Sequence, residues 1–463
     1  MFKIESYKRG IVLSTVFNVF NKGLVFLNGI VVAYYFGASE GTDIFFYTYN
    51  TLIILGAFVM SMNSSVIIPE SMRIRAEEGE KKSMQFLNFF IRFYGSILAC
   101  GILLLLINPV AFFSLISNFK TEQLIQHEIL LYLSLPLFAL ICLITLLVDI
   151  MTSYKFFTIS MIIGIINGTC SIILVMGLHN IAGVKSVFYG FIISYVVNLL
   201  LLLFLLRKYI GWKFTIQKEK IQPRIWKNLG FAQIGNLAST LSLYTPMYIL
   251  SGFNAGIITG LTFAQQIASL PNALITTQFS TVAGIKLNEL YAAARTKDIN
   301  KVFGETANFL HFILIPISCI MFLYAPEIVQ LLLQLTRLDR SIGKYISLFM
   351  QYLGLILPFY VTNTLTSRLF MATHKIKAAF FYQLIFNIIQ IICIYIAVNK
   401  FGIKGYPITL VLIYVSNTLI YYFVQKHFFN FINYVKVLKN LFLFILVNSI
   451  IAVLIFFGIH QLG

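Results

Sequence analysis

The sequence predicts an all-α membrane protein that crosses the bilayer many times. Hydrophobic residues make up 59% of the 463 residues and charged residues only 11%, whereas soluble domains carry about 25% charged residues. The apolar residues fall into about thirteen runs, and each is long enough to cross a hydrocarbon core of about 30 Å as a helix. Because no long polar segment separates these runs, we expect no separate soluble domain.

The candidate spans form two groups of six, followed by one further run. The first group covers residues 10–36, 43–69, 88–108, 126–149, 155–178 and 183–206. The second covers residues 228–252, 256–285, 305–325, 345–367, 377–399 and 405–425, and the last run covers residues 440–459. We therefore expect an N-terminal lobe over 1–206, a basic cytoplasmic linker over 207–227, a C-terminal lobe over 228–425, and an extra C-terminal span within 426–463.

Internal sequence similarity indicates that the second group of spans repeats the first. Residues 183–185 (Gly-Val-Lys) are echoed by residues 402–404 (Gly-Ile-Lys), and Asn198 is echoed by Asn417, both 219 positions later. Since six is an even number of crossings, both copies have the same orientation in the membrane. Transporters built from such parallel repeats bind substrate between their halves and alternate its access. We expect two six-helix lobes around a central cavity.

The basic residues predict the orientation of the chain. Most of the 34 Lys and Arg residues lie in alternating segments, beginning with the N-terminus. The intervening segments contain only Lys120, Lys185, Arg337, Arg340, Lys344, Lys400 and Lys404. Cytoplasmic loops carry an excess of Lys and Arg, so we expect a cytoplasmic N-terminus. The net charge of +18 then reflects topology, and we expect contacts with membrane lipids and none with nucleic acid.

The sequence lacks the motifs of the common ATPases and hydrolases. It contains no GxxxxGK[ST] phosphate-binding loop, no HExxH and no GxSxG. The five cysteines lie inside apolar runs without a CxxC pair, which predicts neither a metal site nor a disulfide framework. We expect a transporter without a cofactor. A membrane scaffold or a glycan-linking enzyme is one alternative. Such enzymes usually have a sizeable external loop, and the sequence shows no such loop.

A polar stripe with a lysine marks the first span. Asn18, Lys22 and Asn28 lie on this run, and Lys22 is twelve residues past Gly10, about 18 Å along a helix. An ammonium at that depth costs about 2.5–3.5 kcal/mol. Lys22 therefore either pairs with a buried carboxylate or faces a substrate cavity. In a cavity it forms an anion site, so this hypothesis predicts a substrate with phosphate or carboxylate groups.

Polar residues in the second half extend the predicted cavity. Asn236 lies in the seventh run, Gln266 lies in the eighth, and Arg368 follows the inner end of the tenth. For each amide alone, an interhelical hydrogen bond is an equally good interpretation. Taken together with the stripe on the first span, these residues favour a shared polar cavity.

Residues 36–46, FGASEGTDIFF, resemble the FGA…TDAFF signature of the MurJ/MviN-type lipid II flippases. This family belongs to the multidrug/oligosaccharidyl-lipid/polysaccharide exporter superfamily. Residues 256–274, GIITGLTFAQQIASLPNAL, are similar to a second stretch of the family. The resemblance implies a flippase that moves an undecaprenyl-pyrophosphate-linked saccharide from the inner to the outer leaflet of the bacterial cytoplasmic membrane by alternating access. The saccharide is lipid II or a polysaccharide repeat unit.

The resemblance also implies roles for individual residues. Lys22 falls at the first of the family's cavity arginines, and Asp43 matches the family's aspartate. Asn28 and Gln266 stand where the family carries arginine. The alternative function is a MATE-like multidrug/cation antiporter, which needs a carboxylate-rich cavity. We expect a monomer, and the sequence does not identify the coupling ion as Na⁺ or H⁺.

Overall fold

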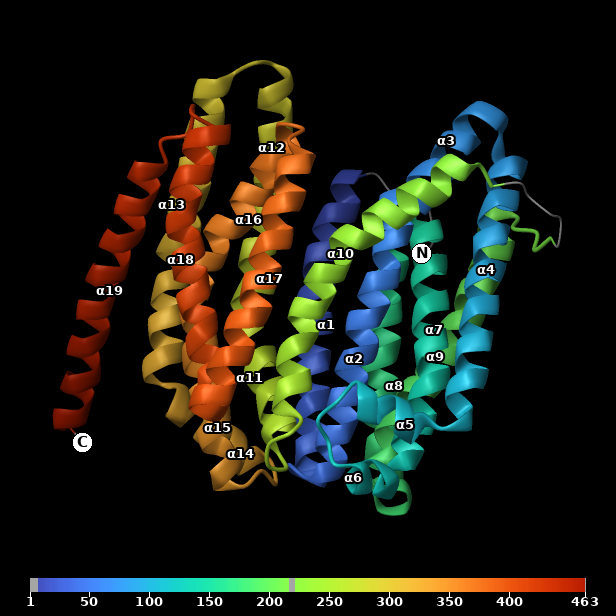
Figure 1. The fold of residues 1–463 in the computed structure, drawn as a ribbon, viewed down its shortest axis with the longest axis horizontal. Coiled ribbons are helices and arrows are strands. Elements are labelled where there is room, and N and C mark those ends of the chain that lie inside the picture. The colour runs from blue at the N-terminus through green and yellow to red at the C-terminus, as the bar shows by residue number, and fades with distance from the viewer. Residues whose placement is uncertain (1–6, 216–220, 463) are drawn as a thin grey trace. The chain divides into compact units, whose positions relative to one another are not determined.

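The computed structural model describes residues 7–215 and 221–462, and it describes the side chains of residues 17, 19–215 and 221–455. Every secondary-structure element in this described part of the chain is helical (Figure 1). The predicted all-α class is therefore confirmed. The chain divides into two compact units, Met1–Thr259 and Gly260–Gly463.

The first unit contains ten α-helices and two short π-helical segments among its described residues, and α11 begins at its end. The elements are α1 (Tyr7–Phe36), α2 (Glu40–Met62), η1 (Asn63–Ile67), α3 (Ile68–Glu78), α4 (Glu80–Ile107), α5 (Pro109–Leu115), α6 (Thr121–Gln126), α7 (Glu128–Ser153), α8 (Thr158–Ala182), α9 (Lys185–Leu205), η2 (Leu206–Ile210) and α10 (Pro223–Leu250). Helices α7, α8 and α9 pack against one another, and α2 packs against α7 (Figure 1).

The second unit continues α11 and holds the remaining helices. The elements are α11 (Ile257–Pro271), η3 (Asn272–Thr276), α12 (Thr277–Ala292), α13 (Thr296–Leu323), α14 (Ala325–Leu335), α15 (Arg340–Leu355), α16 (Leu357–Ala372), α17 (Ile376–Phe401), η4 (Gly402–Lys404), α18 (Gly405–Phe428) and α19 (Tyr434–Leu462). Helix α19 packs along α13, and its described side chains are mostly exposed and apolar.

Nine helical runs in the described chain are long and apolar enough to cross a membrane, and the bent pair α15–α16 makes ten. The count is lower than the predicted thirteen for two reasons. Residues 376–428 form one continuous helical run, although α17 and α18 within it pack against each other. In addition, neither α10 nor the α11–α12 run is among the nine, and both carry polar side chains along their length.

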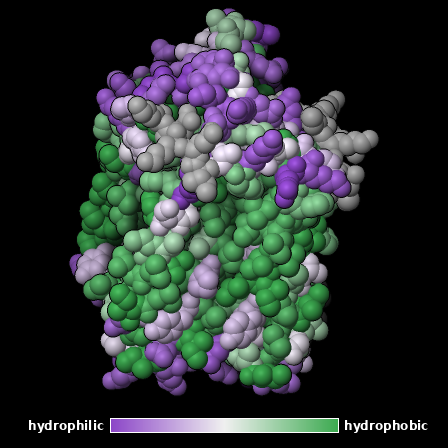
Figure 2. Space-filling model, turned by 90° about the vertical axis from the view of Figure 1, so that its right-hand side faces the viewer, coloured by the Kyte–Doolittle hydropathy of each residue, from purple (hydrophilic) through white to green (hydrophobic). Residues whose placement is uncertain are grey.

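The surface of the first unit suits a lipid environment. Helix α4 exposes Ile97, Leu103, Leu104 and Ile107, the last of them by 79%. Figure 2 shows a broad hydrophobic band over this side of the protein, with hydrophilic residues gathered above it and fewer below it. Soluble monomers rarely expose contiguous apolar patches larger than a few hundred Å². A multi-pass membrane protein is the class that this surface fits.

Backbone geometry supports the predicted repeat. Three pairs of residues with positive φ are each 219 positions apart: Gly37 with Gly256, Lys155 with His374, and Gly183 with Gly402. Gly183 and Gly402 end α8 and α17 with nearly the same backbone angles. Glycine reaches this region of φ without strain, so the turn is preserved where most other side chains have changed.

The second transmembrane helix of each copy is interrupted in the same way. Helix α2 passes through η1 into α3, and α11 passes through η3 into α12, each by five π-helical residues. A π-helical segment is rare and often marks a functional position. The two copies therefore share the order of their helices and a π-helical segment at the same place in the second helix.

Helix α10 belongs to the first compact unit. The sequence instead places it in the C-terminal lobe. It packs against α2 and η1. Asn236 and Gln233 of α10 both donate hydrogen bonds to the Ser61 hydroxyl of α2, at 2.9 and 3.3 Å. The boundary between the two compact units thus falls inside α11. The sequence instead places the boundary between the lobes in the basic segment before α10.

A close helix contact holds α1 on α8. Two glycines of α8, Gly164 and Gly168, form a small-xxx-small pair that faces α1, a pattern that lets helix backbones approach closely in membranes. A Cβ atom added to Gly168 would lie 2.8 Å from the Cβ of Leu24. This contact leaves no room for a methyl group.

We expect Gly168→Ala to destabilise the protein by about 1–3 kcal/mol, because overpacking a tight contact forces the backbones apart. Gly177→Ala on the same helix is the matched control, since nothing lies within 4 Å of its added Cβ. Thermal unfolding of both variants in detergent measures the effect. Equal unfolding temperatures for the two variants would contradict the assigned contact.

Candidate functional site

Helix α1 separates its polar residues between two faces. Asn28 is 7% exposed, and its amide donates a 2.9 Å hydrogen bond to the Ser171 hydroxyl of α8. Asn21 donates to the Met161 carbonyl of α8 at 3.4 Å. Lys22 is exposed, and none of the ion pairs between described residues includes it. Asn28 thus packs α1 onto α8, and Lys22 carries a cation on the free face.

Asn18 lies outside the residues whose side chains the structure describes. It precedes Lys22 by one helical turn within α1. Its assignment to the site stays a prediction.

Asn236 lies on α10, where its amide bonds to Ser61 of α2 at 2.9 Å and to the Ala232 carbonyl at 3.0 Å. The side chain is half-buried. Gln233, one turn earlier, donates to the Phe58 carbonyl at 3.3 Å. The amides of this stripe therefore tie α10 to α2, and Asn236 is brought together with Ser61 rather than with Lys22.

Asp43 caps a helix. Its carboxylate is 2% exposed and accepts hydrogen bonds from the backbone amides of Gly256 and Thr259 at 2.6 and 2.8 Å. The Thr259 hydroxyl donates a third bond at 2.5 Å. These donors form the first turn of α11, where unpaired amides and the helix dipole favour negative charge. Asp43 fixes the start of α11 to the start of α2.

The remaining predicted residues lie in the second unit. Gln266 is half-buried on α11, and its side-chain oxygen has no hydrogen-bond partner. Arg368 of α16 donates to the Thr281 hydroxyl of α12 at 3.3 Å, and its stem packs over Gly284. A membrane-buried carbonyl oxygen without a partner costs free energy. The side-chain oxygens of Gln266 and Asn28 are both in this state, so both amides have spare capacity for a ligand.

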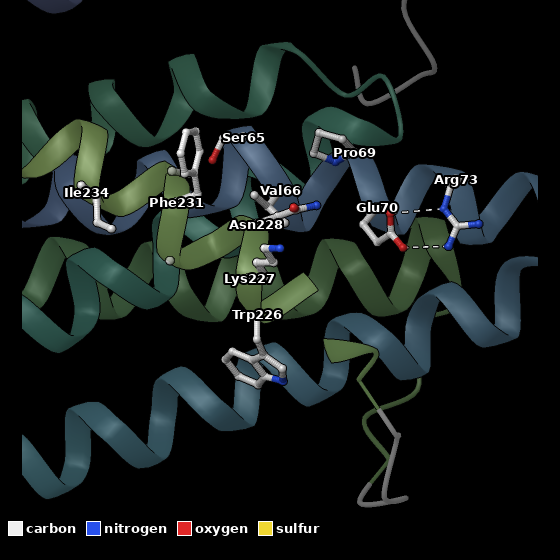
Figure 3. A pocket seen from close by; sticks show the side chains of 12 residues that line it. Ser65, Val66, Pro69, Glu70, Arg73, Trp226, Lys227, Asn228, Phe231 and Ile234 are labelled. Carbon is white, nitrogen blue, oxygen red and sulfur yellow. Dashed lines mark hydrogen bonds and ion pairs between the residues drawn. The ribbon is translucent and has the colours of Figure 1, made fainter. Parts of the chain in front are cut away.

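A groove lies between α10 and the η1–α3 segment, and the sequence did not indicate it. Its volume is about 910 Å³, and Trp226, Lys227, Glu70 and Arg73 are among its lining residues (Figure 3). Glu70 pairs with Arg73 at 2.7 Å and with Arg224 at 3.0 Å. The lining residues of the groove thus include one carboxylate, Glu70, and two cations, Arg73 and Lys227, and Arg73 also pairs with Glu77.

Asp149 is a second carboxylate within a predicted span. It lies on α7, half-buried, and accepts a 3.2 Å hydrogen bond from the Asn63 amide. The sequence placed it at the inner end of a span but gave no partner, because Asn63 lies far from it in the chain.

Metal chemistry finds no support in the described residues. No group of three His, Cys, Asp or Glu side chains there is arranged to hold a metal ion, and the five cysteines are free thiols. The polar groups described above can bind an anion or a proton, or join helices.

The model of the family "Lipid II flippase MurJ" matches residues 32–462. A probable lipid II flippase MurJ of Borreliella burgdorferi is 23% identical over 477 aligned residues, covering 99% of this chain and 90% of that protein. A probable lipid II flippase MurJ of Buchnera aphidicola is 25% identical over 334 residues, covering 67% of this chain and 62% of that protein.

Solved structures share the fold. A lipid II flippase MurJ in an inward closed conformation superposes with a TM-score of 0.79 at 19% identity, covering 98% of this chain and 93% of the other. An inward-facing multidrug resistance MATE family transporter superposes with a TM-score of 0.70 at 15% identity, covering 92% and 94%. At these identities the superpositions establish the architecture and leave the substrate open.

We expect Asp43→Ala to lower the free energy of unfolding by about 1–3 kcal/mol, because three buried donors at the start of α11 lose their acceptor. Asp298→Ala is the control. Asp298 also lies in the first turn of a helix, α13, but its ion pair with Arg295 is exposed, and such pairs contribute little. Thermal unfolding compares the two, and an equal loss in both variants would contradict the capping role.

Proposed function

The chain belongs to the lipid II flippase MurJ family, and from this premise we propose that it moves an undecaprenyl-pyrophosphate-linked saccharide across the bacterial cytoplasmic membrane. The family match over residues 32–462 carries this proposal. The proposed direction is from the inner to the outer leaflet. Lipid II is the proposed cargo, since both curated relatives described above are probable lipid II flippases.

Lys22 is the proposed contact for the pyrophosphate. Its ammonium lies on the exposed face of α1, apart from the asparagines that pack against α8. An intramembrane cation without a carboxylate partner favours a cavity or a charged ligand over lipid. Pyrophosphate offers several anionic oxygens to an ammonium that presents three donors. Electrostatic attraction therefore supports an anionic headgroup over a cationic drug.

The proposed transport cycle is alternating access, in which the site opens to one side of the membrane at a time. The π-helical segments η1 and η3 support this proposal, because such distortions give a long helix a place to change its backbone. Helices α3 and α12, which follow these segments, are the elements that we propose to move within their own units.

The proposed setting follows the charge of the loops. The N-terminus faces the cytoplasm, since the alternate segments that start with it carry most of the Lys and Arg residues. The partners are the lipid-linked saccharide and membrane lipids, and the working unit is a monomer. A MATE-like cation antiporter is the second function that the fold allows, but the cation on α1 argues against it.

We expect Lys22→Ala to weaken transport of lipid II in proteoliposomes. Losing a hydrogen bond to a charged group costs about 1.5–3 kcal/mol, equivalent to a roughly 10- to 100-fold rise in the half-saturating concentration. Lys22→Arg should retain most activity because the charge remains. Lys400→Ala, at the end of α17, should behave as wild type. Full transport by Lys22→Ala would rule out the proposed contact.

We expect the protein to restore growth to a bacterium depleted of its own lipid II flippase, because the proposed cargo is lipid II. The Asp43→Ala variant at matched membrane levels tests whether rescue requires the capped α11. Accumulation of lipid II in the inner leaflet provides the direct readout. Failure of the well-expressed wild-type protein to rescue growth would contradict lipid II as the cargo.

A further inference from the structure

Asp149 has fewer hydrogen-bond donors than the other carboxylate described inside an apolar span. Its partner is the Asn63 amide, which donates at 3.2 Å. Asp43, by contrast, receives three bonds and neutralises the start of a helix. A carboxylate that is well supplied with donors is stabilised in its charged form. Asp149 receives one such bond, so few donors support its charge within the apolar span.

The partner of Asp149 lies at the break in the second helix. Asn63 is fully buried and is the first residue of η1. Its side-chain oxygen accepts a 2.8 Å hydrogen bond from the Tyr94 hydroxyl of α4. A chain of three side chains, Tyr94–Asn63–Asp149, therefore links α4, η1 and α7 at one point.

Few charged groups lie near the hydrogen-bonded side chains Tyr94, Asn63 and Asp149. Helix α2 and segment η1 carry no charged residue between Asp43 and Glu70, and α8 carries none near this end. Arg75 of α3 reaches α7, but it binds the Ser153 hydroxyl at 3.1 Å and lies 3.5 Å from the ring of Tyr154. None of the ion pairs between described residues includes Asp149.

The other titratable groups that face this part of α7 are neutral. Tyr94 comes from α4, and Tyr195 of α9 packs against the core cluster that contains Ile150. Glu80, at the start of α4, lies near Tyr154 rather than near Asp149. Arg75 and Glu80 therefore have their own partners at the end of α7.

The geometry suits a proton better than a metal cation. Sodium and other hard cations need several oxygen ligands, whereas Asn63 presents its amide nitrogen to Asp149 and its oxygen to Tyr94. A proton needs one carboxylate oxygen. Because Asp149 is half-buried, its second oxygen has access for proton exchange.

We propose that Asp149 is a proton-binding site whose ionised form holds η1 against α7. The amide of Asn63 donates to a carboxylate more strongly than to a neutral acid, since charge-assisted hydrogen bonds are about twice as strong. Protonation weakens this link at the π-helical break and frees η1 and α3 to shift against α7. The use of this proton in transport rests on the proposed function; the binding of the proton does not.

Infrared difference spectroscopy of the full-length protein in lipid nanodiscs tests the site directly. A titration from mildly alkaline to mildly acidic pH should reveal a protonated carboxyl band, and Asp149→Asn should remove the component of that band that comes from Asp149. Glu70→Gln removes another carboxylate from the same α2–α3 run and should retain that component. Persistence of the full band in Asp149→Asn would overturn the proposal, as would its absence from the wild type.

A second measurement connects the proton to η1. Trp226 lines the same groove as Ser65 and Val66 of η1, and its ring packs against Phe89 and Phe90 of α4. Its fluorescence in a Trp212→Phe background therefore reports on movement of the groove walls. We expect a pH-dependent change that Asp149→Asn abolishes and Glu70→Gln retains. Tyr94→Phe should move its midpoint, because Asn63 loses a donor. A change that survives in Asp149→Asn would contradict the link.

Transport assays separate this inference from the proposed function. If wild-type vesicles move lipid II and Asp149→Asn removes only the response to a pH gradient, proton binding drives transport. An unchanged response in Asp149→Asn overturns the coupling. If the wild type moves no lipid II, the proposed function fails, whereas the infrared band still decides whether Asp149 binds a proton.

Discussion

The bilayer interior supplies no hydrogen bonds, and the structure is organised by that constraint. A buried amide or carboxyl gains hydrogen bonds there from partners within the protein. Asn28 finds Ser171, Asn63 finds Tyr94 and Asp149, and Asp43 finds the first turn of α11. These bonds fix which helices lie together in the first unit. Lys22 differs from these residues, because none of the ion pairs between described residues includes its ammonium.

The fold was largely predictable because its signals are local. Apolar runs separated by charged turns predict helices of spanning length, and Gly183 and Gly402 mark the same turn in both copies because few other residues adopt its backbone angles. The assignment of α10 to a unit was not predictable. It depends on whether Ser61 of α2 faces Gln233 and Asn236, and periodicity does not identify the partner of a polar stripe.

The sequence predicted which polar residues belong to the candidate site better than it predicted what each of them does. The sequence marked Asn28 as a polar residue of the first span and Asp43 through the family resemblance, but each such side chain can bind a ligand or join two helices. The structure gives both of them protein partners. The groove beside Trp226 had no sequence signal, since its walls come from segments about 160 residues apart. Such a surface exists only after α10 and α3 have packed.

The close contact between α1 and α8 has a consequence for biogenesis. Helix α1 leaves the ribosome before α8 and carries Lys22, yet the glycines that receive it lie on α8, more than 120 residues later. At about 5–20 residues per second, the ribosome needs on the order of ten seconds to supply that partner. During this interval α1 is in the membrane without its final neighbour, and anionic lipid headgroups are the partners that attract a cation such as Lys22. Delivery of the first helix to its final neighbour is therefore a step in which synthesis rate and membrane composition influence the yield of folded protein.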